Sequence, residues 1–383
     1  MKTFILAPDS FKGTLSADEV CQIESAVIRR YVPDARIHTI PMSDGGEGMV
    51  EAYLHAIGGQ RITVPVTGPL GGTVDAVYGL LPDGSAVIEM ASAAGLSLAA
   101  GRPDPLYAST FGVGQLLLNA ASRGIRRILL GLGGSATNDC GIGMAAALGF
   151  QFFGADGCPV APHAVNLGKI CRIQEPEHLP ALEVAAACDV STPLLGPSGA
   201  TYTFGPQKGA DPATLDLLEA GMSRFVQVLT EHYGVSGADV AGAGAAGGMG
   251  TAVLRFLGGT LKPGIELLLD AVHFDELAGA ADMVFTGEGC IDWQSAQGKV
   301  PMGVGLRCKR AGVPCIALCG SAGKGAETLY DCGIHAIFTA IQHTSTFDEI
   351  QKTGRTDLEF LTDAVLRTLF IGCSKPAPGG ETG

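Results

Sequence analysis

Five segments of the chain combine glycine with charged side chains, and each follows an apolar run of the kind that forms a buried strand. They are residues 8–13, 43–48, 131–139, 188–194 with 204–209 shortly after, and 286–299. Backbone N–H groups of glycine turns and helix N-termini bind anions, and nearby lysines add positive charge. Carboxylates in such turns are suitable oxygen ligands for a divalent metal ion. Together these residue types indicate a site for phosphate groups and magnesium.

The first two segments place charge directly after two expected strands. The first contains Asp9, Ser10 and Lys12, which could hold a carboxylate or phosphate at a helix entry. Its alternative interpretation is an ordinary turn with a solvated lysine. The second contains Asp44 and Glu47, which could hold magnesium directly or through water. The alternative for this pair is helix capping, with Asp44 as the N-cap and Glu47 as its capping-box partner.

The third segment is rich in glycine and is expected to cradle phosphate. It carries Gly133, Gly134, Ser135, Thr137 and Asn138 between an apolar strand and a helix of small residues. A strand, a glycine loop and a helix N-terminus give the geometry in which backbone N–H groups bind phosphate. The loop is neither a Walker A motif nor a complete dinucleotide fingerprint. We predict that these residues bind the nucleotide.

The remaining segments supply a candidate base, two candidate metal ligands and two lysines. Asp189 ends an apolar strand, where a carboxylate that faces a ligand can accept a hydroxyl proton. Lys208 could then offset the negative charge of a transferred phosphate. Glu288 and Asp292, followed by Lys299, again place paired carboxylates and a cation just after a strand.

Other catalytic and binding classes lack their sequence signatures. The 8 histidines include no pair at metal-ligand spacing, and no Gly-x-Ser-x-Gly elbow is present. A net charge of −13 argues against nucleic acid or an anionic membrane as a partner, and no apolar run reaches about 18 residues. The 11 cysteines include no Cys-x-x-Cys pair, so we expect reduced, structural thiols in a cytoplasmic protein. Phosphoryl transfer, which needs positioning, metal and positive charge, is the chemistry that remains.

Alternating strands and helices must position these residues. Residues 4–7 read as a buried strand, and Ser16 with Glu19 forms a capping box that begins the next helix. The same strand-and-helix pattern returns in the C-terminal third of the chain. Between about residues 60 and 280 the strands look paired and more antiparallel.

The alternation predicts an α/β protein of two domains. A discontinuous Rossmann- or flavodoxin-like domain with a parallel sheet is expected from residues 1–60 and 282–372. A second α/β domain, residues 61–281, is inserted into it, and residues 373–383 are expected to form a disordered tail. Because clefts at domain junctions are common ligand sites, we expect the ligand cleft between the two domains.

In this order the motifs resemble those of the bacterial glycerate kinases of the first class, the glycerate 2-kinase type. The stretches that carry the resemblance are Ala-Pro-Asp-Ser-Phe-Lys at 7–12, Asp-Gly-Gly-Glu-Gly at 44–48, Gly-Gly-Ser-Ala-Thr-Asn-Asp at 133–139, Ala-Cys-Asp-Val at 187–190, Phe-Gly-Pro-Gln-Lys-Gly-Ala at 204–210, the glycine run at 242–250, Thr-Gly-Glu-Gly at 286–289, Ile-Asp at 291–292 and Gly-Lys-Val-Pro at 298–301. The resemblance implies ATP and Mg²⁺ as cosubstrates, D-glycerate as acceptor and phosphoglycerate, chiefly the 2-phosphate, as product. It also implies a discontinuous Rossmann-like domain that holds a second α/β domain.

Two positions depart from the family pattern. Cys290 stands where the family usually has a basic residue, and residues 111–115 differ from the common Gly-Thr-Gly-Glu pattern. If the basic residue touches phosphate, this protein has lost a cation or supplies it elsewhere. The departures leave the reaction class intact and bear on substrate affinity and identity.

The resemblance and the residues together give a hypothesis for the site. Lys12 and nearby backbone N–H groups hold the glycerate carboxylate, and Asp189 accepts or orients the acceptor hydroxyl. The loop from Gly133 to Asn138 receives the ATP phosphates, and Lys208 offsets charge on the transferred group. The wider set of substrate-binding residues is Asp9, Ser10, Lys12, Asp44 and Lys299, and the candidate magnesium ligands are Asp44, Glu288 and Asp292.

Several alternatives stay open. The phosphate could go to the 3-hydroxyl instead of the 2-hydroxyl, or the acceptor could be another small hydroxy acid. A nucleotide-dependent oxidoreductase and a non-catalytic hydroxy-acid sensor are further alternatives, although the loop lacks the full dinucleotide fingerprint. A homodimer is also left open.

Overall fold

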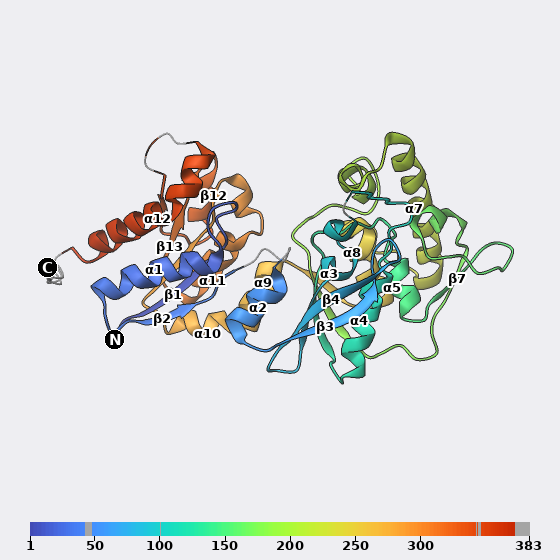
Figure 1. The fold of residues 1–383 in the computed structure, drawn as a ribbon, viewed down its shortest axis with the longest axis horizontal. Helices are drawn as coiled ribbons and strands as arrows, with labels where there is room; N and C mark the ends of the chain where they lie inside the picture. The colour runs from blue at the N-terminus through green and yellow to red at the C-terminus, as the bar shows by residue number, and fades with distance from the viewer. Residues whose placement is uncertain (43–47, 100, 342, 344–345, 372–383) are drawn as a thin grey trace. The chain divides into compact units, whose positions relative to one another are not determined.

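The computed structural model describes residues 1–42, 48–99, 101–341, 343 and 346–371. The chain divides into two compact units, residues 1–44 with 268–383 (unit 1) and residues 45–267 (unit 2). The chain leaves unit 1 after its second strand and returns to it only after completing unit 2 (Figure 1). This is the predicted α/β fold with a discontinuous first domain. The predicted domain limits, at residues 60 and 282, stay a prediction.

Unit 1 is built on a parallel sheet. Its elements are β1 (Thr3–Pro8), α1 (Ala17–Tyr31), β2 (Arg36–Thr39), α10 (Phe274–Gly279), β11 (Met283–Gly287), β12 (Cys290–Ile291), α11 (Val300–Ala311), β13 (Cys315–Cys319), β14 (Ser321–Ala322), β15 (Ala336–Thr339) and α12 (Phe347–Leu369). The five strands of the main sheet lie in the order β2-β1-β11-β13-β15, and every neighbouring pair is parallel. This is the flavodoxin-like order, whose direction of winding reverses between β1 and β11.

The first elements of unit 1 follow from local sequence. Side chains of β1 are buried on both faces of the strand, as expected for a parallel sheet covered by helices on both sides. At the start of α1 the Ser16 hydroxyl accepts from the Glu19 N–H at 3.2 Å, and the Glu19 carboxylate accepts from the Ser16 N–H at 2.9 Å. The predicted capping box is therefore confirmed. Helices α1 and α12 then pack against each other over one face of the sheet (Figure 1).

Unit 2 contains a mixed sheet. Its elements are α2 (Met49–Ile57), β3 (Gln60–Thr67), β4 (Thr73–Leu80), β5 (Ala86–Glu89), α3 (Ala91–Ala94), α4 (Phe111–Ser122), β6 (Arg127–Gly131), α5 (Ile142–Ala147), β7 (Gln151–Phe153), β8 (Arg172–Gln174), β9 (Glu183–Ala187), α6 (Ala200–Phe204), α7 (Pro212–Tyr233), α8 (Ala245–Phe256) and β10 (Thr260–Lys262), and α9 (Gly264–Ala271) crosses the division between the units. The main sheet has the order β10-β9-β6-β5-β4-β3. The pairs β3–β4 and β4–β5 are antiparallel, which confirms the prediction of paired, more antiparallel strands in this part of the chain. The pairs β5–β6, β6–β9 and β9–β10 are parallel. None of the described helices in either unit is long and apolar enough to cross a membrane.

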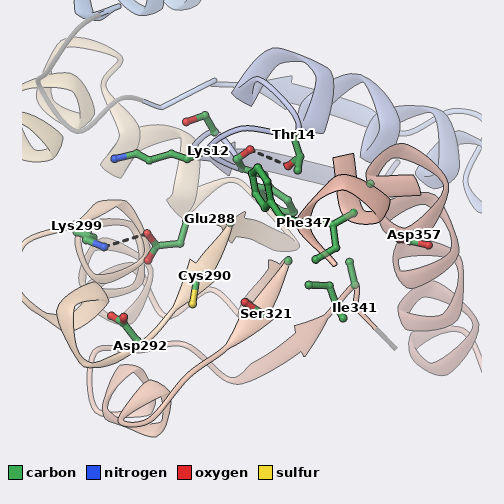
Figure 2. A pocket seen from close by; sticks show the side chains of 17 residues that line it. Lys12, Thr14, Glu288, Cys290, Asp292, Lys299, Ser321, Ile341, Phe347 and Asp357 are labelled. Carbon is green, nitrogen blue, oxygen red and sulfur yellow. Dashed lines mark hydrogen bonds and ion pairs between the residues drawn. The ribbon is translucent and has the colours of Figure 1, made fainter. Parts of the chain in front are cut away.

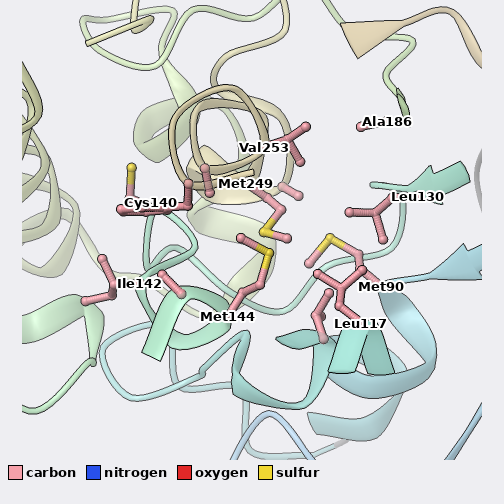
Figure 3. Close-up of a cluster of buried hydrophobic side chains, with 14 of the residues drawn as sticks. Met90, Leu117, Leu130, Cys140, Ile142, Met144, Ala186, Met249 and Val253 are labelled. Carbon is pink, nitrogen blue, oxygen red and sulfur yellow. The ribbon is translucent and has the colours of Figure 1, made fainter. Parts of the chain in front are cut away.

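The core of unit 2 includes residues on both sides of the glycine-rich loop at 131–139. Figure 3 shows Cys140, Ile142, Met144 and Met249 meeting in this core. At the start of α8 the backbone of Gly247 is left-handed (φ 67°), and a Cβ there would lie 2.2 Å from the Thr137 carbonyl oxygen. The Gly247 carbonyl in turn accepts from the Cys140 N–H at 3.0 Å. The glycines of residues 242–250 therefore allow backbone to pack against backbone, which is the structural interpretation of that run.

Candidate active site

The carboxyl edge of the unit 1 sheet carries a pocket of about 330 Å³ (Figure 2). Its walls come from the residues that follow β1, β11, β13 and β15, together with the first turns of α12. Carboxyl ends of parallel strands, and above all the point where the winding reverses, are the usual ligand sites of open α/β sheets. The pocket lies at this edge of the sheet, and residues that follow β1 and β11, the two strands between which the winding reverses, form part of its wall.

The turn after β1 presents Lys12 to the pocket. Phe11 and Leu15 exchange backbone hydrogen bonds of 2.8 and 3.1 Å, which close the turn around Lys12. Asp9 is buried at its base, where its carboxylate accepts from the Ser10 N–H at 2.6 Å. Ser10 and Lys12 line the pocket, whereas Asp9 supports the turn from below.

Glu288, which follows β11, is a buried carboxylate in the wall of the pocket. Its side chain is 9% exposed, and one oxygen, Oε2, lies 3.5 Å from the Lys299 ammonium (Figure 2). The other oxygen, Oε1, is buried without a hydrogen-bond partner among the described residues. Burial raises the pKa of Glu288, while the Ser295 hydroxyl and Lys299 oppose the shift. A buried carboxylate oxygen without a partner is costly and calls for a further cation or donor.

Asp292 and Cys290 complete this wall. Asp292 accepts from the Gln294 N–H at 2.8 Å and so caps the short helix at Trp293–Ala296. The exposed thiol of Cys290 also lines the pocket. Among the described residues no group of three or more His, Cys, Asp or Glu side chains could hold a metal ion by itself. Magnesium commonly keeps water and phosphate oxygens among its ligands and uses only one or two carboxylates of the protein.

The other predicted site residues belong to unit 2. Gly133 and Gly134 are at least partly open to solvent, whereas Ser135, Thr137 and Asn138 are buried. Asn138 donates to the Thr201 hydroxyl at 3.2 Å, and the Thr137 hydroxyl has no partner among the described residues. The loop is thus largely anchored within its own unit.

Lys208 is a structural anchor of this loop. It is 1% exposed, and its ammonium donates to Ser135 Oγ at 3.0 Å and to the Thr137 carbonyl at 2.6 Å. Burial lowers the pKa of Lys208 to about 7, and the Asp139 carboxylate opposes this shift. This burial could not be predicted from the sequence, because a lysine in a glycine-rich turn is usually solvated.

Asp139 is a second residue that anchors this loop, and it was not among the site residues predicted from the sequence. Its buried carboxylate accepts from the N–H and hydroxyl of Thr110, both at 2.9 Å, and from the N–H groups of Gly141 and Gly143 at 3.0 and 3.3 Å. Burial raises the pKa of Asp139, and these hydrogen bonds oppose the shift. An aspartate that ends a polar run before a helix could have been recognised as a turn anchor.

Asp189 follows β9 and is exposed. Its Oδ1 accepts from the Gly264 N–H at 2.8 Å, at the start of α9. Asp189 thus follows the end of a strand, as predicted from the sequence. The hydrogen bond to the Gly264 N–H orients its side chain.

The structure brings part of the predicted set together. Ser10, Lys12, Glu288, Asp292 and Lys299 line one pocket of unit 1. The Gly133–Asn138 loop and Lys208 form one hydrogen-bonded group in unit 2, and Asp189 lies at another strand end of that unit. Asp44 lies outside the described residues. The pocket residues that sequence reasoning missed are those after β13 and β15 and on α12, although the ends of parallel strands were a usable signal for the first two groups.

Lys208→Met is expected to destabilise the protein by about 1–3 kcal/mol, because it leaves the Ser135 hydroxyl and the Thr137 carbonyl without their buried donor. The measurement is urea unfolding, with Lys169→Met, which changes an exposed lysine, as the matched control. If the unfolding midpoints of the two variants coincide, the anchoring role of Lys208 is wrong. A fall in kcat well beyond the loss of folded protein would support its additional role in offsetting charge.

Known proteins resemble this chain over nearly its whole length. The Glycerate kinase family model matches residues 4–370. A glycerate kinase of Halalkalibacterium halodurans is 43% identical over 364 residues, covering 94% of this chain and 96% of that protein. The glycerate 2-kinase of Escherichia coli K12 is 40% identical over 373 residues, covering 96% and 98%. A crystal structure of a Salmonella typhimurium LT2 protein assigned as glycerate kinase 2 matches with a TM-score of 0.85 and 39% identity, over 98% of this chain and 100% of that one. The chain therefore belongs to the glycerate kinase family.

Proposed function

We propose that this protein transfers the γ-phosphoryl group of ATP to glycerate, with Mg²⁺, and forms chiefly 2-phosphoglycerate. The observation that carries the proposal is the pocket of unit 1, where Lys12 and Lys299 accompany the partly unsatisfied carboxylate of Glu288. Phosphoryl transfer depends mainly on positive charge and positioning, and this pocket supplies both. The names of the relatives, glycerate kinase and glycerate 2-kinase, support glycerate as the acceptor.

Glu288 is the proposed magnesium ligand. Its Oε1 is buried in the pocket wall and lacks a partner among the described residues, so the site fits a hard cation. Asp292 lines the same pocket and is proposed as a second ligand, directly or through water. When bound, magnesium would neutralise charge on the phosphates. The remaining proposed ligand, Asp44, lies outside the described residues.

The two lysines of the pocket are proposed to bind anionic groups. Lys299 is held near Glu288 and would meet a phosphate oxygen there. Lys12, at the tip of its closed turn, would bind the glycerate carboxylate with nearby backbone N–H groups of the turn. In the reaction the bond from the γ-phosphorus to the ADP oxygen breaks, and a bond from that phosphorus to the glycerate hydroxyl oxygen forms.

Asp189 is proposed to take the proton that the glycerate hydroxyl releases. Asp189→Asn is then expected to lower kcat about 100-fold or more, because the amide keeps the shape but cannot act as a base. The amide oxygen can still accept from the Gly264 N–H, so the melting temperature should stay close to that of the wild type. The measurement is a coupled ADP-release assay. Near-normal turnover of Asp189→Asn would remove the base role.

NMR of the products after incubation with D-glycerate, ATP and Mg²⁺ tests the proposed reaction. We expect a phosphoglycerate signal that disappears when magnesium is chelated, with the phosphate on the 2-carbon. A signal at the 3-carbon would correct the position of transfer. Absence of phosphoglycerate, together with ATP-dependent protection against thermal unfolding, would contradict glycerate as the acceptor and favour another hydroxy acid. Cys290 would then be the first residue to examine, because it lines the pocket at a position where the family usually has a basic residue.

A further inference from the structure

The pocket of unit 1 has two ends of different chemistry. Figure 2 shows Glu288 and Lys299 at one end, Ile341 and Asp357 toward the other, and the Phe347 ring between them beside the turn that carries Lys12. Further apolar or small residues in the lining are Ala340, Ile350 and Gly354. Glycerate is a three-carbon acid with an oxygen on every carbon, so it has no apolar surface to bury there. A volume of about 330 Å³ also suits a ligand larger than glycerate.

Phe347 forms an open aromatic surface in the pocket. It is the first residue of α12, and although it is a large apolar side chain it is 57% exposed. One edge of its ring rests against the turn after β1, since a Cβ on Gly13 would lie 2.7 Å from the ring. The glycine at this left-handed position (φ 84°) leaves room for the ring. An aromatic ring that is supported on one edge and uncovered on a face is suited to stacking with a planar base.

Gly354 is a second pocket residue of α12, without a side chain that would fill the space. It lies inside α12, where glycine costs about 1 kcal/mol of helix stability relative to alanine, yet it lines the pocket. Asp357, three residues later, lines the same pocket, and its carboxylate already accepts from the Thr353 hydroxyl at 2.6 Å. A carboxylate in this position can accept a hydrogen bond from a donor group of a nucleoside.

We propose that this pocket is the nucleotide site, with the nucleoside along Phe347 toward Asp357 and the phosphates toward Lys299 and Glu288. The inference rests on the proposed kinase function and deepens it. The nucleoside needs a flat apolar surface and a hydrogen-bond acceptor, and the phosphates need cations; Figure 2 shows Lys299 and Glu288 at one end of the pocket and Phe347 and Asp357 beyond them. The prediction from sequence instead gave the phosphates to the Gly133–Asn138 loop, where the Lys208 ammonium is buried and donates to the loop itself.

Two variants test the proposal through binding alone. Phe347→Ala removes the stacking surface, and Gly354→Leu fills part of the pocket while it favours the helix. Each is expected to raise the dissociation constant of ADP about tenfold or more, measured by isothermal titration calorimetry without glycerate. Phe360→Ala is the matched control, because Phe360 is an equally exposed phenylalanine of α12 (59%) outside the pocket lining and should leave the constant unchanged.

The outcomes of these binding experiments separate failure of the nucleotide site from failure of the proposed kinase function. Unchanged ADP binding in both Phe347→Ala and Gly354→Leu would overturn the proposal, as would a rise in the KM of glycerate alone. Because binding of ADP is measured directly, a protein that binds ADP in this way but does not phosphorylate glycerate would refute the proposed function and leave the nucleotide site standing.

Alkylation of Cys290 gives an independent test. The thiols of Cys290 and Cys158 are both exposed, but only that of Cys290 lines the pocket. Saturating ADP is expected to slow the labelling of Cys290 by iodoacetamide at least fivefold and to leave Cys158 unaffected, as followed by peptide mass spectrometry. Equal labelling of Cys290 with and without ADP would contradict a nucleotide in this pocket.

Discussion

Glu288→Gln is expected to lower kcat by about 100-fold or more while the protein stays folded. The substitution removes the negative charge that Oε1 offers to a magnesium ion, and groups that stabilise charge in a transition state commonly contribute this much. The remaining activity should require more magnesium than the wild type needs. The measurement is initial rate against magnesium concentration, at saturating ATP and glycerate.

The folded state of this variant separates catalysis from stability. Burial raises the pKa of Glu288, so the folded protein disfavours the charged carboxylate, and a neutral amide should not lower the melting temperature. Glu327→Gln, which changes an exposed glutamate outside the pocket lining, is the matched control and should keep wild-type rates. Rates of Glu288→Gln within twofold of the wild type would exclude Glu288 as the metal ligand.

Glu24→Leu is expected to stabilise the protein by about 3 kcal/mol at pH 7. Glu24 lies on the inward face of α1, is 0% exposed, and neither carboxylate oxygen has a hydrogen-bond partner among the described residues. Burial raises the pKa of Glu24 to about 8 from an ordinary value of 4.5. Leucine has a similar volume and needs no hydrogen bond in that position.

The pH dependence of unfolding gives the sharper measurement. Between pH 4.5 and about 8 the carboxyl is ionised in the unfolded chain and protonated in the folded one. The unfolded state then binds fewer protons, so the wild-type free energy of unfolding should fall by about 1.4 kcal/mol per pH unit across this window and level off above it. Glu24→Leu should remove this slope, and Glu231→Leu, which changes an exposed glutamate of α7, should not. Parallel pH profiles for wild type and Glu24→Leu would show that Glu24 is not the buried acid.

Local signals made parts of the fold predictable from sequence. The capping box of Ser16 and Glu19 depends on four consecutive residues, so it can be recognised without tertiary structure. The alternation of strands and helices likewise indicated the α/β class. The order of the strands could not be predicted in this way, because the placement of β11 beside β1 depends on packing between segments far apart in sequence.

The site shows the same division. Lys12, Glu288 and Lys299 were found because charge followed an apolar strand, and strand ends of a parallel sheet meet at one edge. Phe347 and Gly354 carry no such signal, since a phenylalanine and a glycine in a long helix look like ordinary helix residues. Only the packing of α12 beside the turn after β1 brings them to the pocket.

The pairing of β1 with β11 also means that, during translation, β1 is made long before the strand it pairs with. Paired residues of these strands are 279 positions apart, and the whole of unit 2 is translated between them. At ordinary rates of translation the first strand waits roughly ten to fifty seconds before its partner leaves the ribosome. Unit 2 can complete its own sheet in that interval, while the apolar segment of residues 3–8 has no neighbour on one side. A nascent chain arrested before residue 283 should therefore present a finished inner domain and an N-terminal strand that chaperones can bind.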